Sequence, residues 1–286
     1  MKVCVIGLGL IGGSTALVLR DKYPSVHIVG VDQSREHASY ALTYGIVDKV
    51  LPLDLGVPEA DLVVLSTPVN SNSKLLLSVL DRLAERAVVM DVGSTKEHIC
   101  QQADTHPKRG RFVAGHPIAG TERSGPEAAF SELLPDKPLI LCDTDQSDYD
   151  AVEFISGVFG RSIGMSISHM SAAEHDRHAA CISHLSHVSA FALGNTVLAQ
   201  NHPAAAEVMA GGGFASITRL AKSSPAVWVP IFSQNQAHLS QALGDYIKSL
   251  TDFKEILDRH DELESYQWIQ RANAVRHGLS GKQTVD

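Results

Sequence analysis

Residues 115 to 125 read GHPIAGTERSG, a mixture of histidine, proline, glycine and charged residues that suits neither a strand nor a helix. The apolar run RFVAG precedes His116, so this histidine is expected where a strand ends. A neutral imidazole accepts a proton near pH 7, and removal of a hydride from a carbinol carbon requires a base for its hydroxyl proton. His116 is therefore a candidate general base, with a histidine that only stabilises a loop as the alternative.

The rest of this stretch suits a rigid loop that fits closely around a ligand. Pro117 restricts the backbone, and Gly120 and Gly125 lack side chains that would keep the backbone away from a bound molecule. Glu122 and Arg123 are adjacent charges, and alone they indicate no more than a surface ion pair of little energetic consequence.

A glycine-rich stretch opens the chain. In VCVIGLGLIGG, Gly7, Gly9 and Gly12 have G-x-G-x-x-G spacing between an apolar strand and a helix that Leu10 and Ile11 open. In dinucleotide-binding folds the first glycine permits a tight turn, the second lets the backbone approach the pyrophosphate, and the third lets the helix pack closely on the strand. The spacing predicts a dinucleotide site, with a glycine-rich turn without a ligand as the alternative.

An acidic residue follows the next expected strand. IVGVD ends in Asp32, at the distance from the glycines where an acid binds the ribose 2′-hydroxyl. Its negative charge would repel a 2′-phosphate, which favours NAD over NADP as the cofactor. Arg35 keeps NADP open, because an arginine accommodates that phosphate, although an arginine at a helix start is more often only solvated.

Two further strand-to-helix turns carry polar residues. LSTPV contains Thr67 and Pro68, and DVGSTKE contains Ser94. Ligands of such folds bind beyond the carboxyl ends of the strands, so these residues are expected to line the cofactor cleft. Ordinary helix capping by Thr67 and Ser94 is the alternative.

The composition excludes several classes of protein. The 286 residues suffice for one large or two ordinary domains. A net charge of -8, without a run of five basic residues, indicates no nucleic-acid partner. No apolar run reaches the length of a membrane helix, so no membrane segment is expected. The cysteines at 4, 100, 142 and 181 lack metal-ligand spacing, which favours reduced core thiols and a cytoplasmic location.

The order of the expected elements divides the chain into two domains. Up to residue 168, strand-like runs alternate with helical patterns, which predicts an α/β fold with an N-terminal Rossmann-type doubly wound parallel sheet. The strand-like runs are KVCVIG, HIVGVD, DLVVLST, AVVMDVG, RFVAGH, PLILC and MSISH. From Ser171 strand signals vanish: SAAE is typical of a capping box that opens a long helix, and further helices are expected over 204–222, 225–258 and 262–277. We expect a dinucleotide-binding domain at 1–168 and an all-α domain at 169–286.

Four histidines share the expected long helix. EHDRHAACISHLSH contains His175, His178, His184 and His187, two pairs with i, i+3 spacing. At about 100° per residue, the first pair lies about half a turn from the second. On a continuous helix the pairs face opposite ways, which excludes a four-histidine metal site, and a two-histidine site would need ligands from elsewhere. We expect no metal, and we expect His175 and His178 to be ordinary histidines of a helix interface.

These motifs together resemble a known family. GHPIAGTERSG, with GLGLIGGS, STPV, DVGSTK, EHDRHAACISHLSHVSAFAL and GGGFASITRLAKSSPAVW, resembles the prephenate and arogenate dehydrogenases of tyrosine biosynthesis from about residue 1 to 275. The resemblance implies NAD-dependent oxidative decarboxylation of prephenate to 4-hydroxyphenylpyruvate, with carbon dioxide and NADH as the other products. It also implies a homodimer formed through the helical domain, which would make that domain a dimerisation domain.

The resemblance implies roles for single residues. His116 matches the catalytic histidine that accepts the ring hydroxyl proton as hydride leaves, and Ser94 matches a serine that touches the same hydroxyl and helps to orient that histidine. Arg219 matches an arginine that holds a substrate carboxylate, a task for which a planar bidentate donor is suited. Glu122 matches an acid at the site rim, associated with substrate binding and with the response to tyrosine.

Substrate choice is less certain. The family match assigns the SHLSH pair to the substrate cleft, with His184 or His187 near a carboxylate. The family often has FRD where this chain has FAS at 214–216, so an arginine and an acid are missing near the second carboxylate or the dimer contact. Arogenate, which differs from prephenate only by an amino group on the side chain, therefore stays open as the substrate.

Two other hypotheses differ in class. A 3-hydroxyacid dehydrogenase with the same two-domain plan would need a lysine base on the long helix, where this chain has SHLSH. A dinucleotide-binding sensor without catalysis would have no reason to keep Ser94, His116, Glu122 and Arg219 together. A chain that ends at residue 286 is expected to lack an appended regulatory domain, so inhibition by tyrosine, if present, would act at the active site.

Overall fold

The computed structural model describes residues 1–200 and 209–275. Contacts within the chain divide it into two compact units, Met1–His238 and Leu239–Asp286. Positions 204–208 of one expected helix and 276–277 of another lie outside the described residues.

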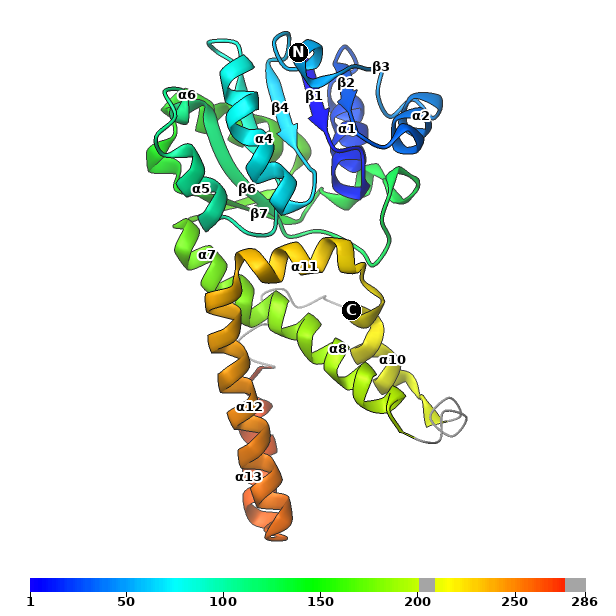
Figure 1. Cartoon of the computed structure of the whole chain (residues 1–286), viewed down its shortest axis with the longest axis vertical. Coiled ribbons are helices and arrows are strands. Elements are labelled where there is room, and N and C mark those ends of the chain that lie inside the picture. The colour runs from blue at the N-terminus through cyan, green and yellow to red at the C-terminus, as the bar shows by residue number, and fades with distance from the viewer. Residues whose placement is uncertain (201–208, 276–286) are drawn as a thin grey trace. The chain divides into compact units, whose positions relative to one another are not determined.

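An eight-stranded sheet forms the centre of the first unit, in the order β3-β2-β1-β4-β5-β6-β7-β8 (Figure 1). The strands are β1 (Lys2–Ile6), β2 (His27–Val31), β3 (Lys49–Val50), β4 (Leu62–Leu65), β5 (Val88–Asp91), β6 (Phe112–Pro117), β7 (Pro138–Cys142) and β8 (Ser166–Met170). All seven runs expected to form strands do so, and the predicted Rossmann-type fold class is confirmed. The two-residue strand β3 was not expected, because it is too short to show a period.

The sheet is not entirely parallel. All neighbouring strands run parallel except β6 and β7, which pair antiparallel. Between them the chain forms only short 3-10 turns, at Pro126–Ala128 and Ser131–Leu133. A parallel return requires a crossover, usually a helix, so this connection brings β7 back in the opposite direction.

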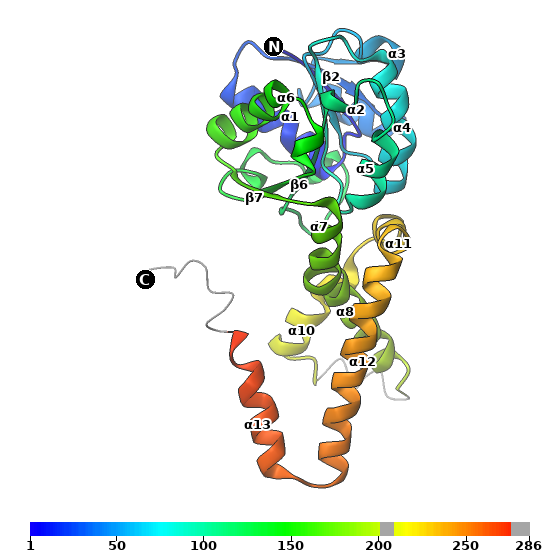
Figure 2. The same cartoon turned by 90° about the vertical axis from the view of Figure 1, so that its left-hand side faces the viewer.

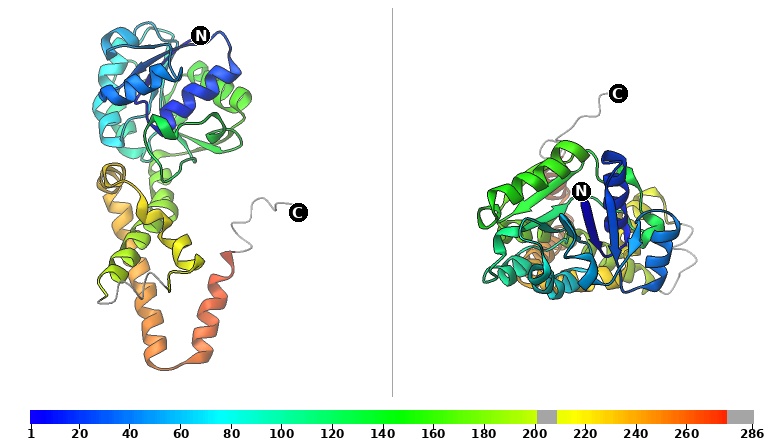
Figure 3. Two further views of the ribbon diagram at one scale, coloured as in Figure 1. Left: turned by 90° about the vertical axis from the view of Figure 1, so that its right-hand side faces the viewer. Right: turned by 90° about the horizontal axis from the view of Figure 1, so that it is seen from above.

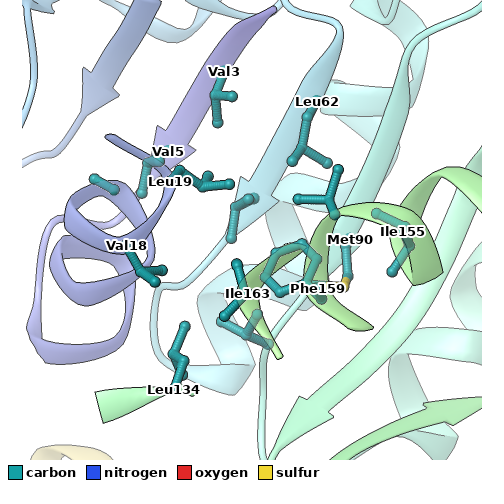
Figure 4. Packing of buried hydrophobic residues seen from close by; sticks show 14 of the residues in the cluster. Val3, Val5, Val18, Leu19, Leu62, Met90, Leu134, Ile155, Phe159 and Ile163 are labelled. Carbon is teal, nitrogen blue, oxygen red and sulfur yellow. The ribbon is translucent and has the colours of Figure 1, made fainter. Parts of the chain in front are cut away.

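Helices cover both faces of the sheet (Figure 3). On β1, Val3 and Val5 pack into one hydrophobic cluster, and the residues that alternate with them pack into a second. The first cluster, shown in Figure 4, joins the sheet to α1 (Leu10–Lys22), to α6 (Tyr149–Ile155) and to the π-helix Ser156–Ile163. The second joins it to α4 (Val69–Arg82) and α5 (Glu97–Ala103). Strands that are buried on both faces are typical of a sheet with helical crossovers.

Other α-helices among the described residues of this unit are α2 (Arg35–Thr43), α3 (Leu53–Gly56), α7 (Ala172–Ala179), α8 (Leu185–Leu198), α10 (Gly212–Thr218) and α11 (Pro225–Gln234). The predicted start of the long helix is confirmed, because Ser171 accepts a hydrogen bond from the Glu174 backbone N–H at 3.2 Å. The helix expected over 225–258 is interrupted. Asn235 leaves the helical conformation and separates α11 from α12 (Gln236–Asp258).

The helix that carries the histidines is not a continuous α-helix. A π-helical segment, Ala180–His184, lies between α7 and α8. A π-helix takes more residues per turn than an α-helix, so it turns less with each residue. The half-turn separation expected between His175 and His184 assumed a continuous α-helix, and the structure does not meet that condition.

In the second unit α12 continues and is followed by α13 (Glu262–Ala272), and the two form a hairpin (Figure 2). The rings of Phe253 and Trp268 lie 4.5 Å apart, centroid to centroid, and join the two helices. His260 adopts a left-handed conformation at the turn, and Asp261 caps α13 by accepting a hydrogen bond from the Glu264 backbone N–H at 2.8 Å.

Three of the four cysteines, Cys4, Cys100 and Cys142, are buried, as expected. The expectation was wrong for Cys181, which is exposed on the π-helical segment. Among the residues described, no helix has the length and apolar character that a membrane span requires.

Candidate active site

The carboxyl ends of neighbouring strands bring the expected site residues to one edge of the sheet. The strand order changes direction between β1 and β4, and open α/β sheets bind ligands at such a switch point. Gly7 follows β1, Thr67 follows β4, Ser94 follows β5, and His116 lies at the end of β6. Four separate stretches of sequence therefore contribute to one edge, as predicted.

Close packing explains two of the three glycines. Gly7 has a φ of +94°, and a Cβ on it would lie 2.7 Å from the Ser66 carbonyl oxygen. A Cβ on Gly12 would lie 2.0 Å from the Gly7 oxygen and 2.3 Å from Ser66 Oγ. Neither position accepts a side chain, because the turn after β1 packs directly on the turn after β4.

Gly9 differs from these two, because, apart from its own neighbours in the chain, no described atom lies within 4 Å of the place where its Cβ would be. It is the N-cap residue of α1, and no side chain caps that helix. Unpaired N–H groups and open space at a helix start suit the pyrophosphate of a dinucleotide. The glycine turn, followed directly by Leu10 and Ile11 in α1, therefore fits the expected cofactor.

Asp32 lies just beyond the end of β2. Its carboxylate accepts hydrogen bonds from the backbone N–H of Leu8 at 2.7 Å and of Ser34 at 2.8 Å. These bonds fix the carboxylate beside the glycine turn and leave lone pairs for a ribose hydroxyl. Arg35 is exposed at the start of α2.

Replacement of Asp32 by asparagine is expected to lower the preference for NAD over NADP by about tenfold or more, because a hydrogen bond to a charged group contributes about 1.5–3 kcal/mol. Asparagine keeps an acceptor for one backbone N–H and removes the charge. The measurement is kcat/KM with each cofactor, and Glu36→Gln, an exposed acid of α2, is the control. An unchanged ratio in Asp32→Asn would exclude Asp32 from cofactor choice.

Helix capping does not account for Thr67 or Ser94. The Thr67 hydroxyl donates to Asn72 Oδ1 at 2.6 Å, and Pro68 precedes α4 without a side-chain cap. The first N–H groups of α5 are capped by Asp176, not by Ser94. The Ser94 hydroxyl has no hydrogen-bond partner in the described ranges, including His116, so it is available to a ligand.

His116 is the first of three side chains that are linked by hydrogen bonds. Its Nδ1 lies 2.7 Å from His175 Nε2, and His175 Nδ1 lies 2.7 Å from Asp176 Oδ1. Asp176 also accepts hydrogen bonds from two backbone N–H groups. Its ionised carboxylate can only accept, so His175 donates a hydrogen bond to it from Nδ1–H. In the tautomer that this bond assigns, His175 accepts at Nε2 and His116 donates from Nδ1. The lone pair of His116 is therefore at Nε2, which has no partner among the residues described.

The electrostatic environment favours a neutral His116 and an ionised Asp176. Burial lowers the pKa of His116 well below its usual value of 6.5, and the nearby positive charge of Lys96 lowers the same pKa further. Burial alone would raise the pKa of Asp176, but the hydrogen bonds from His175 and from the backbone lower it on balance. At neutral pH, His116 is thus uncharged and able to accept a proton, beside an ionised Asp176.

Glu122 and Arg219 come together although they are far apart in sequence. Glu122 Oε2 lies 3.6 Å from Arg219 Nη1, and both side chains are partly exposed. The sequence suggested an ion pair between the neighbours Glu122 and Arg123, but Glu122 pairs with Arg219. The two residues assigned to the substrate by resemblance therefore share one region.

The two histidines of SHLSH have different environments. His184 is buried, Asn235 donates a hydrogen bond to its Nδ1 at 3.1 Å, and its Nε2 has no partner within the described chain. Burial lowers the pKa of His184 to about 4. His187 is half-buried and stacks on Trp228, with ring centroids 3.5 Å apart. Burial lowers the pKa of His187, and the charge of Arg219 lowers it further, so His187 lies within the field of that arginine.

Sequence reasoning missed the residues that hold His116. His175 was assigned to an ordinary helix interface, and Asp176 was not considered. They lie 59 and 60 positions from His116, so local spacing gave no signal. An acid directly after a histidine at a helix start, as in EHD, was the one available sign. No group of three or more His, Cys, Asp or Glu side chains within 1–200 and 209–275 has the arrangement of a metal site.

Comparison with known proteins decides the family. A model of the prephenate dehydrogenase nucleotide-binding domain matches residues 15–167, and a model of the prephenate dehydrogenase dimerization domain matches residues 171–271. The chain belongs to the prephenate dehydrogenase family. The resemblance inferred from the sequence is thereby confirmed. The prediction that the chain is an NAD-dependent oxidoreductase is confirmed as well.

Individual members of the family are similar over nearly the whole chain. A prephenate dehydrogenase of Bacillus subtilis is 33% identical over 98% of this chain and 76% of its own length. The crystal structure of prephenate dehydrogenase from A. aeolicus, in complex with hydroxyphenyl propionate and NAD+, is 33% identical, with a TM-score of 0.89 and 98% of each chain covered. An arogenate dehydrogenase structure from Synechocystis is 28% identical, with a TM-score of 0.79, and the match covers 97% of this chain and 99% of that one.

Proposed function

We propose that this prephenate dehydrogenase family member converts prephenate to 4-hydroxyphenylpyruvate with His116 as the base. One observation carries the proposal: His116 is tied at Nδ1 through His175 to Asp176, which leaves Nε2 as the proton acceptor. When bound, NAD supplies the acceptor for the hydride. His116 accepts the proton of the ring hydroxyl as the hydride leaves, and Ser94, whose hydroxyl is available, donates to or accepts from the same oxygen.

The reaction asks little else of the protein. Once hydride has left the ring carbon, loss of the ring carboxylate as carbon dioxide restores aromaticity, so no further electron acceptor is required. The protein must position the substrate, accept one proton and compensate the negative charges of the two substrate carboxylates. Its residues are suited to these tasks.

Arg219 binds a substrate carboxylate in this proposal, and Glu122 holds its guanidinium until the substrate arrives. Of the two candidate histidines, we assign the substrate contact to His187. It is the more exposed of the pair, it stacks on Trp228, and it lies within the field of Arg219. His184 is buried and bonded to Asn235, which suits a residue that supports the site from behind.

For the cofactor, we propose that Gly7, Gly9 and Gly12, with Leu10 and Ile11, form the turn at the pyrophosphate. Asp32 binds the adenosine ribose. Thr67 and Pro68 line the opposite side of the crevice, because they follow β4, which neighbours β1 across the switch point.

The experiment that tests the function is NADH formation by the purified chain with prephenate and with arogenate, repeated with NADP. Preferential turnover of prephenate with NAD would support the proposal. Arogenate dehydrogenase activity is the second candidate, favoured by the FAS departure at 214–216 and by the similarity to the Synechocystis structure. A kcat/KM for arogenate above that for prephenate would replace the first candidate by the second.

The rate is expected to depend on pH through His116. Its pKa is lowered, so the neutral base is present above that pKa and is lost as the pH falls through it. We expect kcat/KM to stay constant from pH 7.5 down to about 6.5 and to fall only below the ordinary histidine pKa of about 6.5. A profile of kcat/KM against pH measures this. An acid limb centred above pH 7 would contradict the assignment.

We also propose a homodimer and a domain boundary near residues 168–169. Apolar side chains are exposed on both helices of the second unit: Ile247, Leu250, Leu257, Leu263, Tyr266 and Ile269. An exposed apolar surface of this kind marks an interface. The change from strand β8 to helix α7 supports the boundary. Sedimentation that gives the mass of a single chain at micromolar concentration would exclude the dimer.

Tyrosine, if it inhibits, is proposed to compete with the substrate at Glu122 and Arg219, because its carboxylate and phenol resemble those of the product. Inhibition that a high prephenate concentration does not relieve would exclude this site.

We propose a cytoplasmic location, supported by the four cysteines, which are all free thiols. Recovery of the activity outside the cytoplasmic fraction of the source cells would contradict it.

A further inference from the structure

A fully buried ion pair lies behind the candidate catalytic residues. Lys96 is 0% exposed and Asp91 1% exposed, and Lys96 Nζ donates a hydrogen bond to Asp91 Oδ2. Removing two charges from water is costly, and apolar side chains of similar volume often stabilise a protein equally well. Stability alone therefore does not explain this pair.

Each partner of the pair is hydrogen-bonded to the backbone of the residue that precedes a candidate catalytic residue. Asp91 Oδ2 accepts a hydrogen bond from the Gly93 backbone N–H at 2.9 Å, directly before Ser94. Lys96 Nζ donates to the Gly115 carbonyl oxygen at 2.7 Å, directly before His116. One ion pair thus connects the end of β5 to the end of β6.

The surrounding packing leaves little freedom for these peptides. A Cβ on Gly93 would lie 3.0 Å from Asp91 Oδ2, and a Cβ on Gly115 would lie 3.0 Å from the Asp91 carbonyl oxygen. A Cβ at either position would therefore be closer to Asp91 than most side-chain contacts are. The pair is in direct contact with the backbone that it holds.

Lys96 also connects to the second support of His116. Its backbone N–H donates to Asp176 Oδ1 at 2.8 Å, and the same oxygen receives His175 Nδ1. The backbone before His116 and the imidazole ring of His116 are therefore both tied to Lys96. A shift of this lysine would move both.

We propose that Asp91 and Lys96 are positioning residues, which together hold Ser94 and His116 at the separation that proton transfer requires. The inference rests on the proposed function of His116 and Ser94. A displacement of about 1 Å at a reacting group lowers a rate by about 10²-fold, so a small shift of either peptide is enough. The charge of Lys96 contributes a second effect, because it lowers the pKa of His116.

The test is the double variant Asp91→Asn/Lys96→Met, which removes both charges and leaves the Gly115 oxygen without its donor. A matched control exists at the opposite ends of the same strands. There Arg111 pairs with Asp150 and donates to the Ala87 and Arg86 carbonyl oxygens at 3.1 and 2.7 Å. The control variant is Arg111→Met/Asp150→Asn. Both are assayed with prephenate and NAD below their melting temperatures.

We expect the Asp91/Lys96 variant to lose at least tenfold in kcat, while the Kd of NAD and the KM of prephenate change less than twofold. The acid limb of its profile of kcat/KM against pH is expected to move to higher pH, because the charge of Lys96 no longer lowers the pKa of His116. The control is expected to keep kcat within twofold. Wild-type kcat in the Asp91/Lys96 variant, or an equal loss in both variants, would overturn the proposal.

Two further variants separate the possible failures. If the double variant does not fold, Asp91→Glu keeps both charges and displaces the carboxylate, and an unchanged kcat there would overturn the proposal. His116→Asn is assayed alongside. Loss of turnover in His116→Asn with full activity of the Asp91/Lys96 variant would refute only the positioning role. Full activity of His116→Asn would refute the proposed function and this inference together.

Discussion

Replacement of His116 by asparagine is expected to lower kcat by about 10²–10⁴-fold and to leave NAD binding unchanged. Asparagine can donate a hydrogen bond to His175 Nε2 in place of His116 Nδ1, so the ring chain keeps a partner. It has no basic lone pair in place of Nε2, so the ring hydroxyl proton has no acceptor as hydride leaves. Steady-state NADH formation measures kcat, and quenching of protein fluorescence on titration measures the Kd of NAD.

The matched control is His178→Asn. His178 lies on α7 like His175, but its ring is half-exposed and lies 3.7 Å from Glu174. We expect this variant to keep kcat within twofold. Equal activity of His116→Asn and the wild type would show that another group accepts the proton.

The elements that local sequence determines were predictable. Gly7 and Gly12 are required by the turn from β1 into α1, which lies within a few residues of the end of the strand. The apolar runs that form the strands are continuous in sequence. The position of His116 at a strand end followed from the same local pattern. These features depend on short-range sterics and on periodicity, which a single sequence contains.

The contacts that make a site of these residues were not predictable. Glu122 pairs with Arg219 and not with its neighbour Arg123, and His116 pairs with His175; each partner comes from the helical half of the chain. Such pairs depend on tertiary packing, which leaves no trace in local spacing. The π-helical segment is a further example, because the sequence pattern gave no sign that the helix departs from regular α-helical geometry before His184.

Replacement of Asp176 by asparagine is expected to lower kcat by at least about 10²-fold, through the tautomer of two histidines. Asp176 Oδ1 accepts His175 Nδ1–H, which forces His175 Nε2 to accept and His116 Nδ1 to donate. The single oxygen of asparagine, in the place of Oδ2, keeps the hydrogen bond from the Glu97 N–H. The amide nitrogen in the place of Oδ1 then loses the bond from the Lys96 N–H and donates to His175 Nδ1, so the hydrogen bonds among the three side chains reverse and the proton of His116 moves to Nε2. A base whose acceptor atom already carries a proton is inactive, and loss of the orienting carboxylate in a comparable triad costs about 10⁴-fold.

The tautomer can be observed directly. Nitrogen-15 NMR of the histidine side chains should show His116 protonated at Nδ1 in the wild type and at Nε2 in Asp176→Asn. Asp143→Asn is the control, because Asp143 accepts a backbone N–H of α7, from Ala172 at 2.8 Å, without touching a histidine. Both variants weaken a helix-end contact, and such a contact contributes about 1 kcal/mol, so the control shows what the weakening of such a contact does by itself. If Asp176→Asn kept the wild-type tautomer and still lost activity, Asp176 would act by fixing the α5 turn, and the orientation of His116 would not depend on it.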